Sequence, residues 1–250
     1  MSEIRQIAIY GKGGIGKSTT VSNLAVALAE KGLQVMQIGC DPKADSTVSH
    51  LNGKRPTAVL ELIRKYNDDF VWQDMVTFGE SRIACVEAGG PVPGMGCAGR
   101  GIINALEKLE SKGAYDAVKP DVVLYDVLGD VVCGGFAMPM REGYADRVYI
   151  ITSGENMSIY AAANIAMALK NFQSRNYAKL GGFILNCRNV KDEFGKVQTL
   201  ADDFESSIAG IIPRSETVTA AEELHKTVLS AFPQSDTAAA YRKLAESIWE

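Results

Sequence analysis

The segment from Gly11 to Ser18 has the residue types and the spacing needed to bind a polyphosphate. It reads GKGGIGKS, with four residues between the first glycine and a Gly-Lys-Ser sequence, which is the pattern of the phosphate-binding loop. Glycines let successive N–H groups point at phosphate oxygens, and a helix that begins here adds its positive dipole end. We expect Lys17 to reach the β- and γ-phosphates and Ser18 to offer its hydroxyl to Mg²⁺. The expected nucleotide contacts in this stretch are Gly11, Lys12, Gly13, Gly14, Ile15, Gly16, Lys17, Ser18 and Thr19.

Lys12 is a second lysine that an ordinary loop of this kind does not need. Its side chain cannot easily enter the same phosphate cradle as Lys17. Two interpretations remain open: a solvated surface lysine, or a lysine that neutralises phosphate across an interface with a second subunit.

Several carboxylates follow apolar stretches that read as strands. Asp126 ends the apolar run that begins at Val122, and we expect it near Mg²⁺, directly or through water. Asp130 could orient or deprotonate an attacking water, and Asp41 and Asp45 add carboxylates to the same network. The alternative is that these acids only cap strands and loops.

The five cysteines separate by their surroundings. Cys97 and Cys133 lie among glycines, which permit close approach of a bulky group and leave N–H donors free for inorganic sulfur. Cys40, Cys85 and Cys187 lie within or at the ends of apolar strands, where a small apolar residue is the default. A 4Fe-4S cluster requires four thiolates, so two identical chains would each donate Cys97 and Cys133 around a twofold axis. Zinc held by the same four thiolates remains an alternative.

The distance along the chain between Asp130 and Cys133 suggests a mechanism. They are three residues apart, within about 10 Å of backbone. A shift of the loop from Asp126 to Asp130 on binding or loss of the γ-phosphate would therefore be transmitted to Cys133.

The pattern of apolar residues predicts a P-loop NTPase of the α/β class, with a mainly parallel sheet covered by helices on both faces. No break in composition marks a second domain, so residues 1–250 are expected to form one. The predicted strands are 5–10, 34–39, 82–87, 122–126, 147–152, 180–186 and 208–212, and the predicted helices are 19–31, 57–66, 102–112, 158–172, 192–205, 217–231 and 236–249.

Composition narrows the class of partner. The net charge is −4, which argues against nucleic acid as the main partner. No apolar run of about 18 residues is present and the first residues lack the apolar core of a signal peptide, so we expect a cytoplasmic protein that does not bind membranes.

Four stretches together resemble the nitrogenase iron protein family: Gly11–Ser18, Cys40–Thr47, Gly94–Gly101 and Tyr125–Met138 (YDVLGDVVCGGFAM). The resemblance implies a homodimeric, ATP-dependent reductase. One 4Fe-4S cluster would bridge the subunits and pass low-potential electrons to a nitrogenase-like heteromeric catalytic component, with ferredoxin or flavodoxin as electron donor. The cofactors implied are this cluster and MgATP.

The resemblance also implies roles for individual residues. Lys12 and Lys17 would contact phosphates, Ser18 and Asp45 Mg²⁺, and Asp126 would belong to the switch loop. Further roles fall on Asp41 and Asp130 (water activation and coupling), on Asn186, Pro213 and Arg214 (the adenine side), and on Arg100 (partner contact or modification).

The chain departs from nitrogenase reductases in two ways. Ser215 replaces the usual aspartate after Pro-Arg, and the sequence ends at Glu250 without the C-terminal extension of those proteins. These departures favour a nitrogenase-like system, of the methylthio-alkane reductase or tetrapyrrole reductive cyclase type, over nitrogenase itself. The main alternative function is a dimeric partitioning or positioning ATPase of the ParA/MinD type, which shares the two-lysine loop and has no cluster. A small-molecule kinase on the same fold is a further alternative.

Overall fold

The structure is a computed structural model that describes residues 4–90, 98–129, 138–140, 144–172 and 177–250. Within these residues, eight strands form one sheet in the order β3-β4-β2-β5-β1-β6-β7-β8. All neighbouring strands are parallel except β3 and β4. The strands are β1 Arg5–Tyr10, β2 Val35–Gly39, β3 Thr77–Phe78, β4 Ala84–Glu87, β5 Val122–Asp126, β6 Arg147–Thr152, β7 Lys179–Asn186 and β8 Ile208–Ile212.

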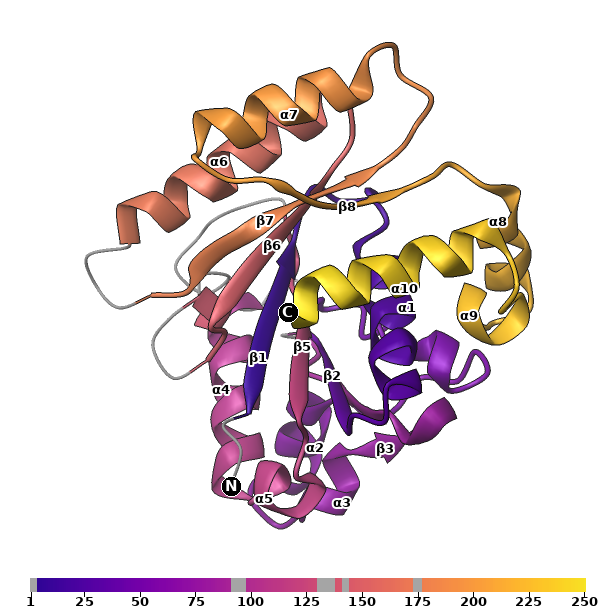
Figure 1. Cartoon of the computed structure of the whole chain (residues 1–250). Helices are drawn as coiled ribbons and strands as arrows, with labels where there is room; N and C mark the ends of the chain where they lie inside the picture. Colours follow the sequence, from indigo (N-terminus) through magenta and orange to yellow (C-terminus); the bar gives the residue numbers. More distant parts are fainter. Residues whose placement is uncertain (1–3, 91–97, 130–137, 141–143, 173–176) are drawn as a thin grey trace.

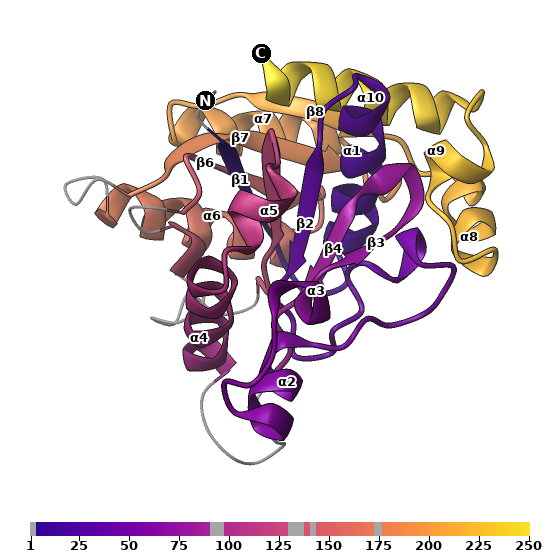
Figure 2. The ribbon, with the colours of Figure 1, turned by 90° about the horizontal axis from the view of Figure 1, so that it is seen from below.

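Helices cover both faces of this sheet (Figures 1 and 2). One face carries α1 Lys17–Glu30, α8 Glu216–Glu223, α9 Val228–Ala231 and α10 Asp236–Trp249; the other carries α2 Val59–Tyr66, α4 Ala98–Ser111, α5 Ala114–Val118, α6 Asn156–Phe172 and α7 Glu193–Asp203. A four-residue helix, α3 Trp72–Met75, precedes β3. The mainly parallel sheet between two helical layers confirms the predicted fold class.

The sheet has a hydrophobic core on each face, and the alternation of side chains along each strand supplies both. In β1, Ala8 and Tyr10 belong to the core under α4 and α6, whereas Ile7 and Ile9 belong to the core under α1 and α10. Successive residues of a strand point to opposite faces, so a strand apolar throughout can be buried on both.

Strand β1, which leads into the phosphate loop, pairs with β5, which ends at Asp126. Ile9 pairs with Asp126, and Asp126 also pairs with Gly39 of β2. The carboxyl ends of β1, β2 and β5 therefore meet at one edge of the sheet, where open α/β sheets bind ligands.

Most predicted elements are present, with ends shifted by a few residues. The helix predicted over 217–231 is wrong as a single element, because the structure has two, α8 and α9. His225 between them has a φ of 55°, which an α-helix cannot accommodate. The Asn23 side chain of α1 accepts hydrogen bonds from the backbone N–H groups of Val228 and Leu229 and so fixes the start of α9.

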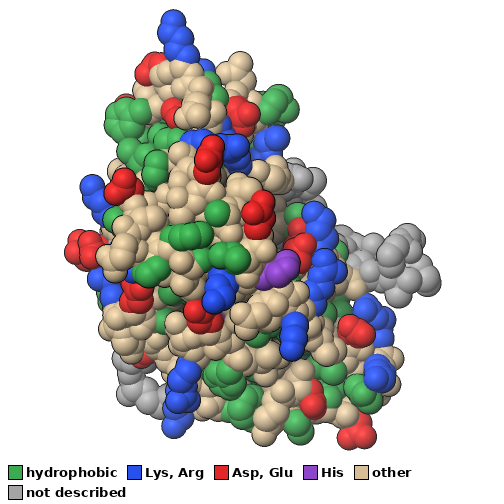
Figure 3. Space-filling view, turned by 90° about the vertical axis from the view of Figure 1, so that its right-hand side faces the viewer, with side chains coloured by type: hydrophobic (Ala, Val, Ile, Leu, Met, Phe, Trp, Pro, Cys, Tyr) green, Lys and Arg blue, Asp and Glu red, His purple; other side chains and the backbone are tan. Residues whose placement is uncertain are grey.

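Among the described residues, no helix combines the length and apolar character needed to span a bilayer. On the face shown in Figure 3, positive and negative side chains are interspersed.

Candidate functional site

The phosphate loop joins β1 to α1 and is held from the far side by β7. Gly16, with a φ of 97°, immediately precedes α1. Asn186, the last residue of β7, donates from Nδ2 to the Ile15 carbonyl at 2.6 Å, and Arg188 donates to the Gly14 carbonyl at 3.0 Å. The loop is thus fixed in shape by side chains more than 170 residues away in sequence.

At two positions of the site, neighbouring atoms lie so close that only glycine fits. A Cβ at Gly16 would lie 2.7 Å from Asn186 Nδ2, in addition to the strain of a positive φ. A Cβ at Gly129 would lie 2.6 Å from the carbonyl carbon and 2.8 Å from the amide nitrogen of Gly11. The segment after β5 therefore packs backbone against backbone on the phosphate loop.

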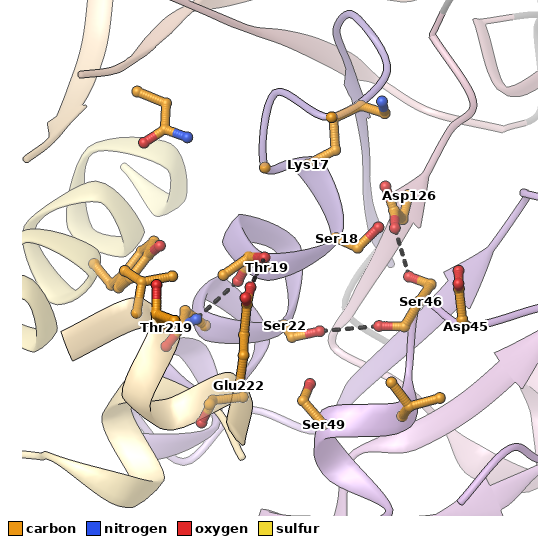
Figure 4. Close-up of a pocket in the computed structure, with 18 of the residues that line it drawn as sticks. Lys17, Ser18, Thr19, Ser22, Asp45, Ser46, Ser49, Asp126, Thr219 and Glu222 are labelled. Carbon is orange, nitrogen blue, oxygen red and sulfur yellow. Dashed lines mark hydrogen bonds between the residues drawn. The ribbon is translucent and has the colours of Figure 1, made fainter. Parts of the chain in front are cut away.

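Asp126 is the buried carboxylate of the site. It is 3% exposed, and Ser46 Oγ donates to its Oδ2 at 2.6 Å. Burial raises its pKa above the ordinary value, while hydrogen bonds from Ser18 and Ser46 and the charge of Lys17 act in the opposite direction. Figure 4 shows Ser18, Ser46 and Asp45 gathered around this carboxylate at one side of the cavity. Such a set of hydroxyl and carboxylate oxygens suits Mg²⁺, whose charge would offset the cost of burying Asp126.

A second buried carboxyl lies beneath the same edge of the sheet. Glu87 ends β4, and its Oε1 accepts hydrogen bonds from the Thr47 N–H at 2.8 Å and the Thr47 hydroxyl at 2.7 Å. Its Oε2 is buried without a hydrogen-bond partner. Burial raises the pKa of Glu87 to about 7 despite the two hydrogen bonds.

A cavity of about 700 Å³ opens above these groups. Most of the predicted nucleotide residues line it: Gly13, Gly14, Gly16, Lys17, Ser18, Thr19, Asp41, Asp45, Asp126, Asn186, Pro213 and Arg214. Gly11, Lys12 and Ile15 are not among the lining residues: Gly11 and Ile15 are buried within the loop, and Lys12 is half-buried.

The cavity has a second wall that the sequence did not indicate. Thr219 and Glu222 of α8 and Tyr241 of α10 line it, and Thr19 donates its hydroxyl hydrogen to Glu222 Oε1 at 2.9 Å (Figure 4). These residues lie in the C-terminal fifth of the chain and match no short motif. Only the packing of α8 and α10 beside α1 reveals them.

Arg100 does not line this cavity and is an exposed residue of α4. Asp41 does line it, and its Oδ1 accepts a hydrogen bond from the Lys43 N–H at 2.8 Å. Cys97, Asp130 and Cys133 lie outside the described residues, although α4 begins at Ala98, directly after Cys97.

The three described cysteines are free thiols. Cys40 and Cys85 are fully buried; burial raises the pKa of Cys40 well above its ordinary value and that of Cys85 to about 12. Burial, together with nearby Glu193, raises the pKa of Cys187 to about 11. A thiol with a raised pKa resists forming the thiolate that binds metal. Across the described part of the chain, no group of three or more His, Cys, Asp or Glu side chains is arranged to hold a metal ion.

A parallel sheet whose first strand runs into a glycine-rich loop, with buried oxygen ligands beside it, defines a P-loop nucleotide-binding protein. Solved structures with this fold include the cell division ATPase MinD of Pyrococcus furiosus (TM-score 0.75, 21% identity, 99% of each chain covered). They also include a ParA family ATPase of Chlorobium tepidum (TM-score 0.73, 18% identity, 97% of this chain and 98% of that one). At these identities the likeness concerns the fold alone.

Sequence comparison identifies the family within this class. Residues 5–250 match the 4Fe-4S iron sulfur cluster binding proteins, NifH/frxC family, and the chain belongs to that family. The nitrogenase iron protein of Methanospirillum hungatei is 52% identical over 248 residues, covering 98% of this chain and 88% of the relative. That of Methanococcus voltae is 48% identical over 248 residues, covering 99% and 89%. The predicted family resemblance and its cluster-binding character are confirmed.

Proposed function

We propose that the chain is the ATP-hydrolysing electron donor of a nitrogenase-like system, acting as a homodimer around one 4Fe-4S cluster. Membership of a cluster-binding family supports the redox role, and the buried oxygen ligands beside the phosphate loop support the use of MgATP. The coupling of ATP hydrolysis to electron transfer is supported by the close contact of Gly129 with Gly11. This contact joins the nucleotide loop to the segment that runs to Cys133.

Cys97 and Cys133 are the proposed cluster ligands, two from each subunit. Elimination supports them, because Cys40 and Cys85 are buried in the cores and Cys187 lines the nucleotide cavity. The position of Cys97 directly before α4 adds a helix N-terminus, which favours an anionic group. When bound, the cluster supplies the one-electron chemistry that no side chain of this chain provides.

The remaining site residues bind the nucleotide, the metal ion or the attacking water. Lys17 binds the β- and γ-phosphates, while Ser18, Asp45 and Asp126 supply oxygen to Mg²⁺ or its water. Asp41 and Asp130 orient the attacking water. Asn186, Pro213 and Arg214, which also line the cavity, contact the adenine.

The dimer gives Lys12 its role. Its side chain is half-buried and lies outside the lining of the cavity of its own subunit. It would therefore neutralise phosphate in the partner's cavity rather than its own.

Proposed partners follow from the relatives, which are nitrogenase iron proteins. The partner is a nitrogenase-like catalytic component, contacted through a surface that includes exposed Arg100. A ferredoxin or flavodoxin supplies the electron. Chemistry of this kind, with free thiols at the three described cysteines, belongs in the cytoplasm.

Anaerobic purification tests the cluster assignment. The unaltered protein should be brown, contain iron and show absorption that bleaches on reduction. Cys97→Ser and Cys133→Ser should each lose the iron, whereas the control Cys85→Ser should keep it. Equal loss in all three variants would refute the ligand assignment. A colourless, iron-free dimer that binds nucleotide would favour the partitioning ATPase instead.

A further inference from the structure

Gln37 is a polar residue in the middle of a central strand. It is fully buried, and it points to the face covered by α1, as Val35 of the same strand does. A buried amide without partners destabilises a fold, so its hydrogen bonds account for its presence. Its Nε2 lies 3.0 Å from the Ser46 carbonyl, 3.0 Å from Ser46 Oγ and 3.2 Å from Ser22 Oγ, and its Oε1 lies 2.9 Å from His50 Nε2.

The directions of these hydrogen bonds follow from chemistry. A backbone carbonyl only accepts, so the NH₂ end of Gln37 must face Ser46 and its oxygen must face His50. His50 Nε2 must then carry the hydrogen, which leaves its buried Nδ1 as an acceptor without a partner. Burial lowers the pKa of His50 to about 4, consistent with a neutral ring.

The hydrogen bonds continue in the same direction from Ser46 to Asp126. Ser46 Oγ accepts from Gln37, so its own hydrogen is available to Asp126 Oδ2, 2.6 Å away. Ser22 of α1 donates to the Ser46 carbonyl at 3.1 Å and fixes the same residue from the helix (Figure 4). One ordered path therefore runs from His50 through Gln37 and Ser46 to the carboxylate.

We propose that Gln37 is a positioning residue for the metal site: with His50 behind it, it fixes the Ser46 hydroxyl, which orients Asp126 toward Mg²⁺. This proposal rests on the proposed function, because the proposed function is what assigns Asp126 to Mg²⁺. Groups that orient metal ligands in this way typically change metal affinity 10- to 100-fold, roughly, when they are removed.

The test is a Mg²⁺ titration of ADP binding to the full chain. Gln37→Met keeps the length of the side chain and removes all its hydrogen bonds. It should raise the Mg²⁺ concentration for half-maximal stabilisation of the ADP complex by about tenfold or more. Binding of ADP without Mg²⁺ should not change. Ser46→Ala, which leaves Gln37 bonded to the Ser46 carbonyl, should have a similar effect and covers the case in which Gln37→Met fails to fold.

Two comparisons separate positioning from general loss of stability. Tyr125→Phe removes a partly buried hydrogen bond, from the Tyr125 hydroxyl to Gln6 Oε1, one residue before Asp126. It should lower the melting temperature and leave the Mg²⁺ dependence unchanged. Gln37→Met added to Ser46→Ala should not weaken Mg²⁺ further, because both act through one hydroxyl.

The outcomes also distinguish this proposal from the proposed function. If the unaltered chain binds ADP with no dependence on Mg²⁺, the metal assignment itself is wrong. If that dependence exists and Gln37→Met behaves as Tyr125→Phe does, only the positioning role is refuted. Additive effects of Gln37→Met and Ser46→Ala on Mg²⁺ affinity would refute it equally.

Discussion

Replacing Gly129 by alanine should disturb the phosphate loop directly. The added Cβ would lie 2.6 Å from the Gly11 carbonyl carbon, against about 3.5 Å for ordinary contact between carbons. The Gly11 carbonyl oxygen lies closer still. These atoms are backbone and cannot rotate away, so the two segments must separate by at least about 1 Å. Overpacking of this kind costs about 1–3 kcal/mol, which corresponds to a fall in melting temperature of about 2–12 °C for a chain of this size.

The same displacement should weaken function more than stability. A misplacement of about 1 Å in a catalytic constellation can cost on the order of 100-fold in rate. We expect Gly129→Ala to reduce ATP hydrolysis by about that factor while the iron content remains normal, measured on anaerobic protein.

Gly32→Ala is the matched control for this prediction. Gly32 has a φ of 86°, and a Cβ there would meet nothing within 4 Å, so alanine adds backbone strain without a clash. It should lower the melting temperature by a few degrees and leave hydrolysis unchanged. If Gly129→Ala hydrolyses ATP as fast as Gly32→Ala does, the added Cβ does not displace the phosphate loop, and the reasoning from the Gly129–Gly11 contact is refuted.

Three further predictions concern the loop, the interface and the buried carboxyl. Asn186→Ala removes the hydrogen bond to the Ile15 carbonyl and should weaken ADP binding about fivefold, the equivalent of about 1 kcal/mol; an unchanged affinity in a titration would contradict this. Lys12→Gln should leave ADP binding intact and reduce ATP-dependent association of two chains, measured by size-exclusion chromatography; normal association would return Lys12 to a solvated surface role. The pKa of Glu87, about 7 in the folded chain against 4.5 ordinarily, means that its contribution to stability is complete below pH 4.5 and is lost as the pH rises through 7. The melting temperature of Glu87→Gln relative to the unaltered chain should therefore be higher at pH 8 than at pH 5, and an equal difference at both would show that Glu87 does not titrate there.

The sequence predicted the elements that have local signals. Apolar runs identified the parallel strands β1, β5, β6 and β8 to the residue, because strands buried on both faces are continuous in apolar residues. The position of the phosphate loop followed from its local motif, although Gly11, Lys12 and Ile15 do not line the cavity as the other loop residues do.

Features that depend on distant contacts were missed. The two-residue edge strand β3 exists only through its antiparallel pairing with β4. The break at His225 depends on Asn23, about 200 residues earlier, and Tyr241 joins the cavity only because α10 packs against α1. The hydrogen bonds of Gln37 to Ser22, Ser46 and His50 likewise could not be read from its neighbours in sequence.

The Lys17 ammonium donates to the Lys12 carbonyl at 3.1 Å, within the same loop. An ammonium carries three hydrogens, so Lys17 can keep this hydrogen bond while it donates another to a phosphate oxygen, and that charge-assisted hydrogen bond is the stronger of the two. Because the loop already has its curvature, little chain entropy is lost on binding. The Lys12 carbonyl therefore preorganises the lysine, holding its charge inside the loop before any nucleotide arrives.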